Sequence, residues 1–221
     1  FKAMAGQTIG IIGGTGSGKS TLVNLIPRFY DATEGEIDIA GENVREYTYE
    51  SLRKMISVVP QKAQLFAVTI RDNLMFGCPD ATEEQIEEAL VISQAKEFVD
   101  TKEGRLDAVV EQGGKNLSGG QRQRLTLARA LVPQSDILIM DDSASALDYA
   151  TDAKLRKAIQ NMKRKPTVFI VSQRTSSIQD ADSILVLDDG KIAGKGTHEE
   201  LIASCDIYRE IYETQFKKEE A

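Results

Sequence analysis

Short apolar runs alternate along the chain with segments whose apolar residues recur every three or four positions. Runs of this kind, bounded by turn residues, are typical of buried strands, whereas the three-to-four spacing is typical of helices. The runs predict strands at about residues 8–12, 36–40, 56–59, 137–140, 167–171 and 184–187. The wider spacing predicts helices at about residues 19–28, 82–95, 150–162 and 206–216. Strands that alternate with helices indicate an α/β fold with a parallel sheet.

The alternation is interrupted between about residues 69 and 131, where helix signals dominate. Thr82 with Gln85, and Ser118 with Gln121, have the spacing of a capping box, in which each side chain bonds to the other residue's backbone N–H. We therefore expect a helical insertion here. Thr197 with Glu200 predicts a further capped helix, after a turn at Asp189 and Gly190 that leads into a strand from Lys191.

Composition limits the possible classes of protein. A chain of 221 residues can bury one core with an inserted lobe, and a net charge of −7 argues against a nucleic-acid surface. Cys78 and Cys205 are the two cysteines and are far apart in sequence, so we expect reduced thiols. No apolar run reaches the roughly 18 residues that a spanning helix needs. The chain starts at Phe1 without an initiator Met, which suggests a piece of a longer protein.

The strongest motif is GGTGSGKS, which fits the phosphate-binding loop pattern between a predicted strand and a predicted helix. Backbone N–H groups of such a loop surround phosphates, the lysine reaches the β and γ phosphates, and the serine ligates Mg²⁺. The alternative is a glycine-rich connection with no ligand. The sequence favours a nucleoside triphosphate as substrate. The expected nucleotide-binding residues are Gly13, Gly14, Thr15, Gly16, Ser17, Gly18, Lys19, Ser20 and Thr21.

A second half of the site is predicted at the end of the apolar run ILIMD, residues 137–141. Asp141 follows this strand, and a carboxylate in that place holds Mg²⁺ in phosphate-loop proteins. Taken alone, it could equally be a strand-end residue that caps a turn. Together with the loop, it predicts Asp141 and Ser20 as magnesium ligands.

The pentapeptide LSGGQ, followed by RQRLTLARAL, resembles the signature of the nucleotide-binding domains of ATP-binding cassette (ABC) transporters. In that family the signature contacts the γ-phosphate of ATP bound by a partner domain. The resemblance implies a P-loop NTPase (RecA-like) α/β core with an inserted helical subdomain, and Mg²⁺ with ATP as ligands. The signature residues are Leu117, Ser118, Gly119, Gly120 and Gln121.

On this resemblance we expect four segments. The core comprises residues 1–61 and 132–205, with further strands expected before Phe1; the helical subdomain comprises 62–131, and a C-terminal helix and tail comprise 206–221. Only twelve residues precede Gly13, and Phe1 is too close to the loop to stack on adenine as an upstream aromatic does in the family.

Further motifs resemble those of exporters. Gln61 in VVPQ matches the glutamine that senses Mg²⁺ and the attacking water, and Glu111 matches an acidic residue that touches transmembrane coupling helices. A solvated loop charge is the alternative for Glu111. Leu65, Phe66 and Ile70 are expected in the core. The D-loop, which crosses the dimer interface in the family, corresponds to Ser145, Ala146, Leu147 and Asp148. The implied partners are a second nucleotide-binding domain and a transmembrane domain, on the cytoplasmic side of a membrane.

Two positions depart from the family pattern. Asp142 stands where the family has a catalytic glutamate, and Gln173 stands where it has a switch histidine. His198, the one histidine, is expected only to open a helix. We hypothesise a site that binds ATP and hydrolyses it slowly or not at all, as in the degenerate subunit of a heterodimeric bacterial multidrug exporter. The alternatives are a slow but competent ATPase in a symmetric dimer, an ATP-gated regulatory or channel domain, and a soluble ABC ATPase.

Overall fold

The computed structural model describes residues 1–143 and 145–216, apart from the side chain of Phe216. The charged tail KKEEA at 217–221, included above in the C-terminal segment, lies outside the described residues. The chain divides into two compact units. The first unit comprises Phe1–Ile56, Ile139–Asp142 and Thr167–Ala221, and the second comprises Ser57–Leu138 and Ser143–Pro166.

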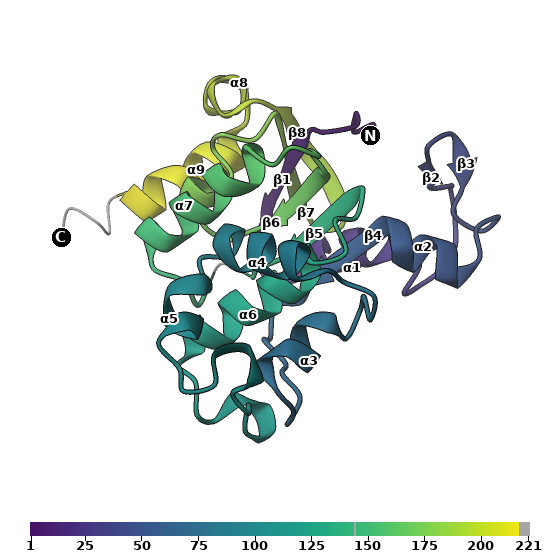
Figure 1. Ribbon diagram of the computed structural model, residues 1–221. Coiled ribbons are helices and arrows are strands. Elements are labelled where there is room, and N and C mark those ends of the chain that lie inside the picture. Colours follow the sequence, from purple (N-terminus) through teal and green to yellow (C-terminus); the bar gives the residue numbers. More distant parts are fainter. Residues whose placement is uncertain (144, 217–221) are drawn as a thin grey trace. The chain divides into compact units, whose positions relative to one another are not determined.

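The first unit is built on a sheet of predominantly parallel strands (Figure 1). Its central strand β1 (Thr8–Gly13) pairs in parallel with β6 (Thr167–Val171) on one side and with β7 (Ser183–Asp188) on the other. The end of β5 (Ile137–Asp141) follows beyond β6, and β8 (Lys191–Gly196) runs antiparallel to β7 at the other edge. Strand β1 is buried throughout its apolar run, as expected for a strand covered on both faces. The predicted α/β fold class is confirmed.

Helices and a small hairpin complete the first unit. Two differences from the sequence prediction are that the first helix stops at Leu25, before Arg28 turns to a φ of 57°, and that the strand expected at 36–40 has only two residues. The turn at Asp189 and Gly190 has the two positive φ angles, 44° and 75°, that a tight hairpin needs. The elements are α1 (Lys19–Leu25), β2 (Asp38–Ile39), β3 (Glu42–Asn43), α2 (Tyr49–Met55), η3 (Thr175–Ser177), α8 (His198–Ser204) and α9 (Asp206–Phe216).

The second unit is mostly helical and takes in most of β4 (Ile56–Val59). Its longest helix, α6 (Gly119–Leu131), packs against α3 (Ile70–Met75) and α4 (Glu83–Ile92). The capping boxes predicted at Thr82 and Ser118 are both formed, but α4 stops before residue 95 because Gln94 adopts a φ of 60°. The helices are α3 (Ile70–Met75), α4 (Glu83–Ile92), α5 (Lys96–Asp100), η1 (Arg105–Asp107), η2 (Gln112–Gly114), α6 (Gly119–Leu131) and α7 (Tyr149–Gln160).

One core assignment is wrong. Leu65 and Ile70 are buried as expected, whereas Phe66 is 45% exposed. Its ring stacks on the ring of Phe76 at a centroid distance of 4.5 Å, and the guanidinium of Arg129 lies 5.8 Å from it. The two aromatic rings shield each other at the surface, so Phe66 needs no place in the core. Among the helices of the described residues, none combines the length and apolar character needed to cross a bilayer.

Candidate functional site

The predicted phosphate loop connects β1 to α1 in the first unit, and its backbone requires glycine. A Cβ added to Gly13 would lie 2.1 Å from the carbonyl oxygen of Leu187, so no other residue fits without displacing β7. Gly18 precedes α1 with a φ of 95°, and no side chain caps the helix start. The N–H groups of the first turn are therefore left to an external acceptor, and the positive end of the helix favours an anion there.

Lys19 directs its charge back over this loop. Its Nζ donates hydrogen bonds to the carbonyl oxygens of Gly13 (2.9 Å) and Gly14 (2.7 Å). Burial lowers the pKa of the Lys19 ammonium, and the nearby charges of Asp142 and Asp141 act in the opposite direction. The loop thus carries a partly desolvated cation beside two carboxylates, where its field on a phosphate is stronger than in water.

Ser20 and Asp141 meet as the sequence predicts. The Ser20 hydroxyl donates to Asp141 Oδ1 at 2.9 Å. Burial raises the pKa of Asp141; the hydrogen bond from Ser20 and the charge of Lys19 lower it, whereas the charge of Asp142 raises it further. A hydroxyl and a carboxylate are the hard oxygen ligands that Mg²⁺ prefers. Within the described residues no group of three or more His, Cys, Asp or Glu forms a metal cage. The pair fits an Mg²⁺ ion that shares its remaining ligands with phosphates and water.

Asp142 and Gln173 form the most unusual part of the site. Asp142 follows β5 with a φ of 47°, so the chain turns there into the left-handed region, and its N–H donates to Val171 O at 2.9 Å. The Gln173 side chain reaches toward it, with Nε2 at 3.5 Å from Asp142 Oδ2, at the limit of a hydrogen bond. The two positions that depart from the family pattern therefore face each other, next to Lys19 and Asp141.

The signature lies in the second unit at the start of α6. Ser118 Oγ accepts from the N–H of Gln121 at 3.2 Å, and Gln121 Oε1 accepts from the N–H of Ser118 at 3.0 Å. This box occupies the hydroxyl oxygen of Ser118 as an acceptor and leaves its O–H free to donate. A Cβ on Gly120 would lie 3.6 Å from the carbonyl oxygen of Ala146, so the signature and the predicted D-loop are neighbours within this unit.

The predicted D-loop contains both exposed residues and residues that support the fold. Ser145 and Ala146 are exposed, whereas Leu147 is buried. Asp148 caps α7, since its two carboxylate oxygens accept from the N–H of Thr151 at 2.9 Å and from its hydroxyl at 2.8 Å. Hydrogen bonds from the Thr151 N–H and hydroxyl lower the pKa of Asp148. The residue fixes the direction in which α7 leaves the loop.

The other two predicted residues also lie in the second unit. Gln61 is exposed in the segment after β4, and Glu111 is exposed immediately before η2. The loop with Glu111 is held by Asn116, whose Oδ1 accepts from the N–H of Glu111 at 3.1 Å and whose Nδ2 donates to Val109 O at 2.9 Å. The first unit thus holds the phosphate loop, Asp141, Asp142 and Gln173, and the second holds the signature, the D-loop, Gln61 and Glu111.

Sequence reasoning did not identify Asn116 or Arg122 as supports of these loops. Arg122 Nη1 donates to the carbonyl oxygens of Leu117 (2.7 Å) and Gly114 (3.3 Å), which fixes the turn before the signature. A Cβ on Gly114 would lie 2.6 Å from Arg122 Cδ. The available signal was the position of an arginine directly after LSGGQ, where a long donor can reach the carbonyls that precede a helix.

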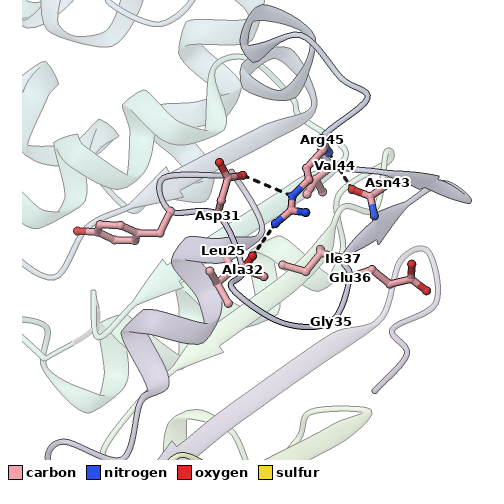
Figure 2. Close-up of a pocket in the computed structure, with 10 residues that line it drawn as sticks. Leu25, Asp31, Ala32, Gly35, Glu36, Ile37, Asn43, Val44 and Arg45 are labelled. Carbon is pink, nitrogen blue, oxygen red and sulfur yellow. Dashed lines mark hydrogen bonds and ion pairs between the residues drawn. The ribbon is translucent and has the colours of Figure 1, made fainter.

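A surface hollow in the first unit is lined by residues between Leu25 and Arg45, none of which is a predicted site residue (Figure 2). Figure 2 shows Arg45 reaching across it, with Nη2 donating to Ala32 O at 2.5 Å and the guanidinium 4.0 Å from the Asp31 carboxylate. Of its charged lining residues, Arg45 donates to Ala32 O and Asp31 accepts from Arg28, so both help to hold the segment after α1. We regard the hollow as part of the scaffold.

Comparisons with known proteins agree with this geometry. Residues 1–145 match the ABC transporter family. The ATP-dependent lipid A-core flippase of Haemophilus ducreyi is 41% identical over 219 residues, which cover 99% of this chain and 38% of the flippase. An uncharacterized ABC transporter ATP-binding protein of Mycobacterium bovis is 47% identical over 216 residues, which cover 96% of this chain and 37% of that protein.

The solved structure of a bacterial Atm1-family ABC exporter with ATP bound has the same fold, with a TM-score of 0.93 at 35% identity. The match covers 97% of this chain and 38% of the exporter chain. This chain therefore spans less than two fifths of the length of these relatives. The family match, the identities and the fold together show that the chain belongs to the ABC transporter family, as an ATP-binding domain homologous to those of ABC exporters.

Proposed function

We propose that this chain is the nucleotide-binding domain of an ABC exporter whose own ATP site is degenerate. It binds Mg-ATP on the phosphate loop and hydrolyses it slowly or not at all. Its signature completes the catalytic site of a partner domain that carries glutamate and histidine. The observation that carries the proposal is the pair formed by Asp142 Oδ2 and Gln173 Nε2, 3.5 Å apart beside the loop.

The length of Asp142 supports slow chemistry. A general base or water-orienting group has to lie within about 2.6–3.2 Å of the attacking water. Aspartate is one methylene shorter than glutamate, which withdraws the carboxylate by roughly 1 Å, and a displacement of that size costs on the order of 10²-fold in rate.

The chemistry of Gln173 also supports slow hydrolysis. Its amide can donate a hydrogen bond to a γ-phosphate oxygen, but it cannot become cationic as histidine can. Stabilisation of the charge that develops on the transferring phosphoryl group is therefore weaker. The Gln173 amide faces the Asp142 carboxylate at the limit of hydrogen-bonding distance, so both departures from the family pattern lie at the same place beside the loop.

The residues proposed to bind the phosphates and Mg²⁺ are retained beside the altered pair. Lys19 supplies positive charge to the phosphates, and Ser20 with Asp141 would hold Mg²⁺. When bound, the ion neutralises charge on the β and γ phosphate oxygens. Gln61 is proposed to contact the ion and the water. Retention of these groups beside a weakened base favours a site kept for binding over one that has lost its use.

The remaining motifs suit a partner. Ser118 and Gln121 present an ordered helix start, with a free O–H, to a γ-phosphate held by a second domain. Ser145 and Ala146 of the D-loop are exposed, and Ala146 lies next to that helix start. Exposed Glu111 would contact a transmembrane domain at the cytoplasmic side of a membrane, which couples dimer closure to transport. Export of multiple drugs, suggested by the sequence, stays a proposal.

The test is restoration of catalysis. We expect the purified chain to bind Mg-ATP and, in a single-turnover assay, to hydrolyse it far below the roughly 10 s⁻¹ of a typical enzyme. The double substitution Asp142→Glu and Gln173→His should raise the rate by about 10²-fold or more. Asp188→Glu, which adds the same methylene at an exposed position, is the matched control and should leave the rate unchanged.

Two outcomes would contradict the proposal. Ordinary turnover by the unmodified chain would favour the slow but competent homodimeric ATPase over the degenerate subunit. In a heterodimer with the partner, Asp142→Ala should leave most of the turnover, because the partner's glutamate acts on the other ATP. If Asp142→Ala abolished turnover as fully as removal of that glutamate, the division of labour would be wrong.

A further inference from the structure

The C-terminal helix α9 makes direct contact with the segment that carries Gln173. Gln215, near the end of α9, makes three hydrogen bonds to this segment. Its Oε1 accepts from the N–H of Thr175 at 2.9 Å and from the Thr175 hydroxyl at 3.0 Å, and its Nε2 donates to the carbonyl oxygen of Gln173 at 2.6 Å. The Gln215 side chain thus bonds to the backbone on both sides of residue 174.

The chemistry of the partners fixes the orientation of the Gln215 amide. A backbone N–H can only donate and a carbonyl oxygen can only accept, so the oxygen must face Thr175 and the nitrogen must face Gln173. Thr175 is 1% exposed and begins η3, which packs against α9. The contact is therefore specific, and a side chain of similar shape without both groups would not reproduce it.

Helix α9 is itself anchored before it reaches this segment. Tyr208, Tyr212 and Gln215 are spaced four and three residues apart, which places them on one face of the helix. Tyr208 is fully buried and its hydroxyl lies 2.8 Å from His198 Nδ1; the ring of Tyr212 is 5.1 Å from the ring of His198. The face that presents Gln215 is thus held against the first residue of α8, and the helix can act as a fixed support.

Hydrogen bonds of Ser172, the residue before Gln173, also hold this segment. The N–H of Ser172 donates to Ile11 O in β1 at 3.1 Å, and Ser172 Oγ accepts from the N–H of Arg174 at 2.9 Å. Gln173 itself is exposed, and its side chain faces Asp142. Because the direction of a side chain follows the backbone that carries it, the bond at the Gln173 carbonyl helps to decide where its amide points.

We propose that Gln215 is a positioning residue for the nucleotide site, which holds the backbone of Gln173 so that its amide stays beside Asp142, where the proposed function has it bond to the γ-phosphate. The inference rests on the proposed function of Gln173 in binding ATP. It makes α9 a part of the site's support, although the helix follows the switch position by more than 30 residues. Loss of Gln215 should then affect the nucleotide that has a γ-phosphate and spare the one that lacks it.

The first test compares the affinities for Mg-ATP and Mg-ADP of the full chain and of Gln215→Met, by calorimetric titration. We expect binding of Mg-ATP to weaken by about threefold to tenfold, the size of one hydrogen bond, with binding of Mg-ADP unchanged. Thr214→Ala is the matched control, because the exposed Thr214 hydroxyl bonds to Glu210 O within α9; it should change neither affinity. Equal weakening of both nucleotides, or of neither, would overturn the proposal.

A double-mutant cycle separates positioning from general support of the fold. If Gln215 acts through Gln173, Gln215→Met should have no further effect on Mg-ATP affinity in a Gln173→Ala background, whereas additive effects would overturn the proposal. Gln215→Glu, a second variant, can still accept both bonds from Thr175 but cannot donate to Gln173 O. It should lose Mg-ATP affinity like Gln215→Met; affinity equal to the parent would show that the Thr175 bonds suffice and that the proposal is wrong.

The results also distinguish this inference from the proposed function. If the parent chain binds Mg-ATP and Gln173→Ala weakens that binding while Gln215→Met does not, only the inference fails. If Gln173→Ala leaves Mg-ATP affinity unchanged, the proposed contact between Gln173 and the γ-phosphate fails and the inference fails with it.

Discussion

Replacing Asp141 with asparagine removes one negative charge while keeping the oxygen that accepts the Ser20 hydrogen bond. Burial raises the pKa of Asp141, so the structure disfavours its ionised form when no cation is bound. We therefore expect the free Asp141→Asn chain to unfold at the same temperature as the parent or at a higher one. Mg-ATP should reverse this order, because a neutral amide is a poor ligand for Mg²⁺.

The size of the reversal can be estimated. Ligand at 100 times its Kd stabilises a protein by about 2.7 kcal/mol. If loss of the carboxylate weakens Mg-ATP binding about 100-fold, the same concentration stabilises the variant by only about 0.4 kcal/mol. For a chain of 221 residues, 1 kcal/mol corresponds to roughly 2–4 °C in Tm. The parent should therefore gain about 5–9 °C more than the variant.

Differential scanning fluorimetry measures the Tm of the parent and of Asp141→Asn, with and without Mg-ATP. Asp38→Asn makes the same chemical change at an exposed strand position of the same unit and should respond to Mg-ATP as the parent does. With ATP and a chelator, parent and Asp141→Asn should respond alike, because the difference depends on the ion. An equal Mg-ATP response in parent and Asp141→Asn would refute the assignment of Asp141 as a magnesium ligand.

Three other predictions concern the scaffold. Gly13→Ala should cost about 1–3 kcal/mol or more in unfolding free energy, measured by urea denaturation, whereas Gly14→Ala, which meets no atom within 4 Å, should cost less than about 1 kcal/mol. Burial raises the pKa of Tyr208 to about 12, so between about pH 10 and 12 the folded state keeps a proton that the unfolded state releases. The free energy of unfolding should therefore fall as pH rises from about 10 to about 12. Thermal melts at alkaline pH should show no such fall for Tyr208→Phe. Hydrogen bonds lower the pKa of Asp148, so its contribution to stability is present at neutral pH and lost as pH falls through the folded pKa; Asp148→Ala should lower Tm at neutral pH and matter little in acid.

The parts of the site that the sequence predicted depend on short-range rules. The loop at Gly13 and the boxes at Thr82, Ser118 and Thr197 are fixed by residues three or four positions apart or by one backbone conformation. The parallel character of the sheet was predicted from the local alternation of strands and helices, whereas its strand order was not.

Two of the features that were missed depend on tertiary contacts that no local pattern predicts. The bonds of Gln215 span 40 and 42 residues, and a glutamine in a polar helix carries no pattern that names its partner. Phe66 was expected in the core because an apolar residue in an apolar segment usually is; the ring of Phe76, ten residues later, is what allows it to stay exposed. Such contacts become visible only when the chain is folded.

The reciprocal bonds between Ser118 and Gln121 would affect the speed of the proposed assembly with a partner domain. Because each of these side chains bonds to the other residue's backbone N–H, the helix start is ordered before any partner arrives. The conformational entropy of this segment is lost when the second unit folds, and not when a partner binds. A partner that brings ATP to this surface then meets a rigid target. Encounter of the two domains, rather than ordering of the signature, would set the rate at which such a dimer closes.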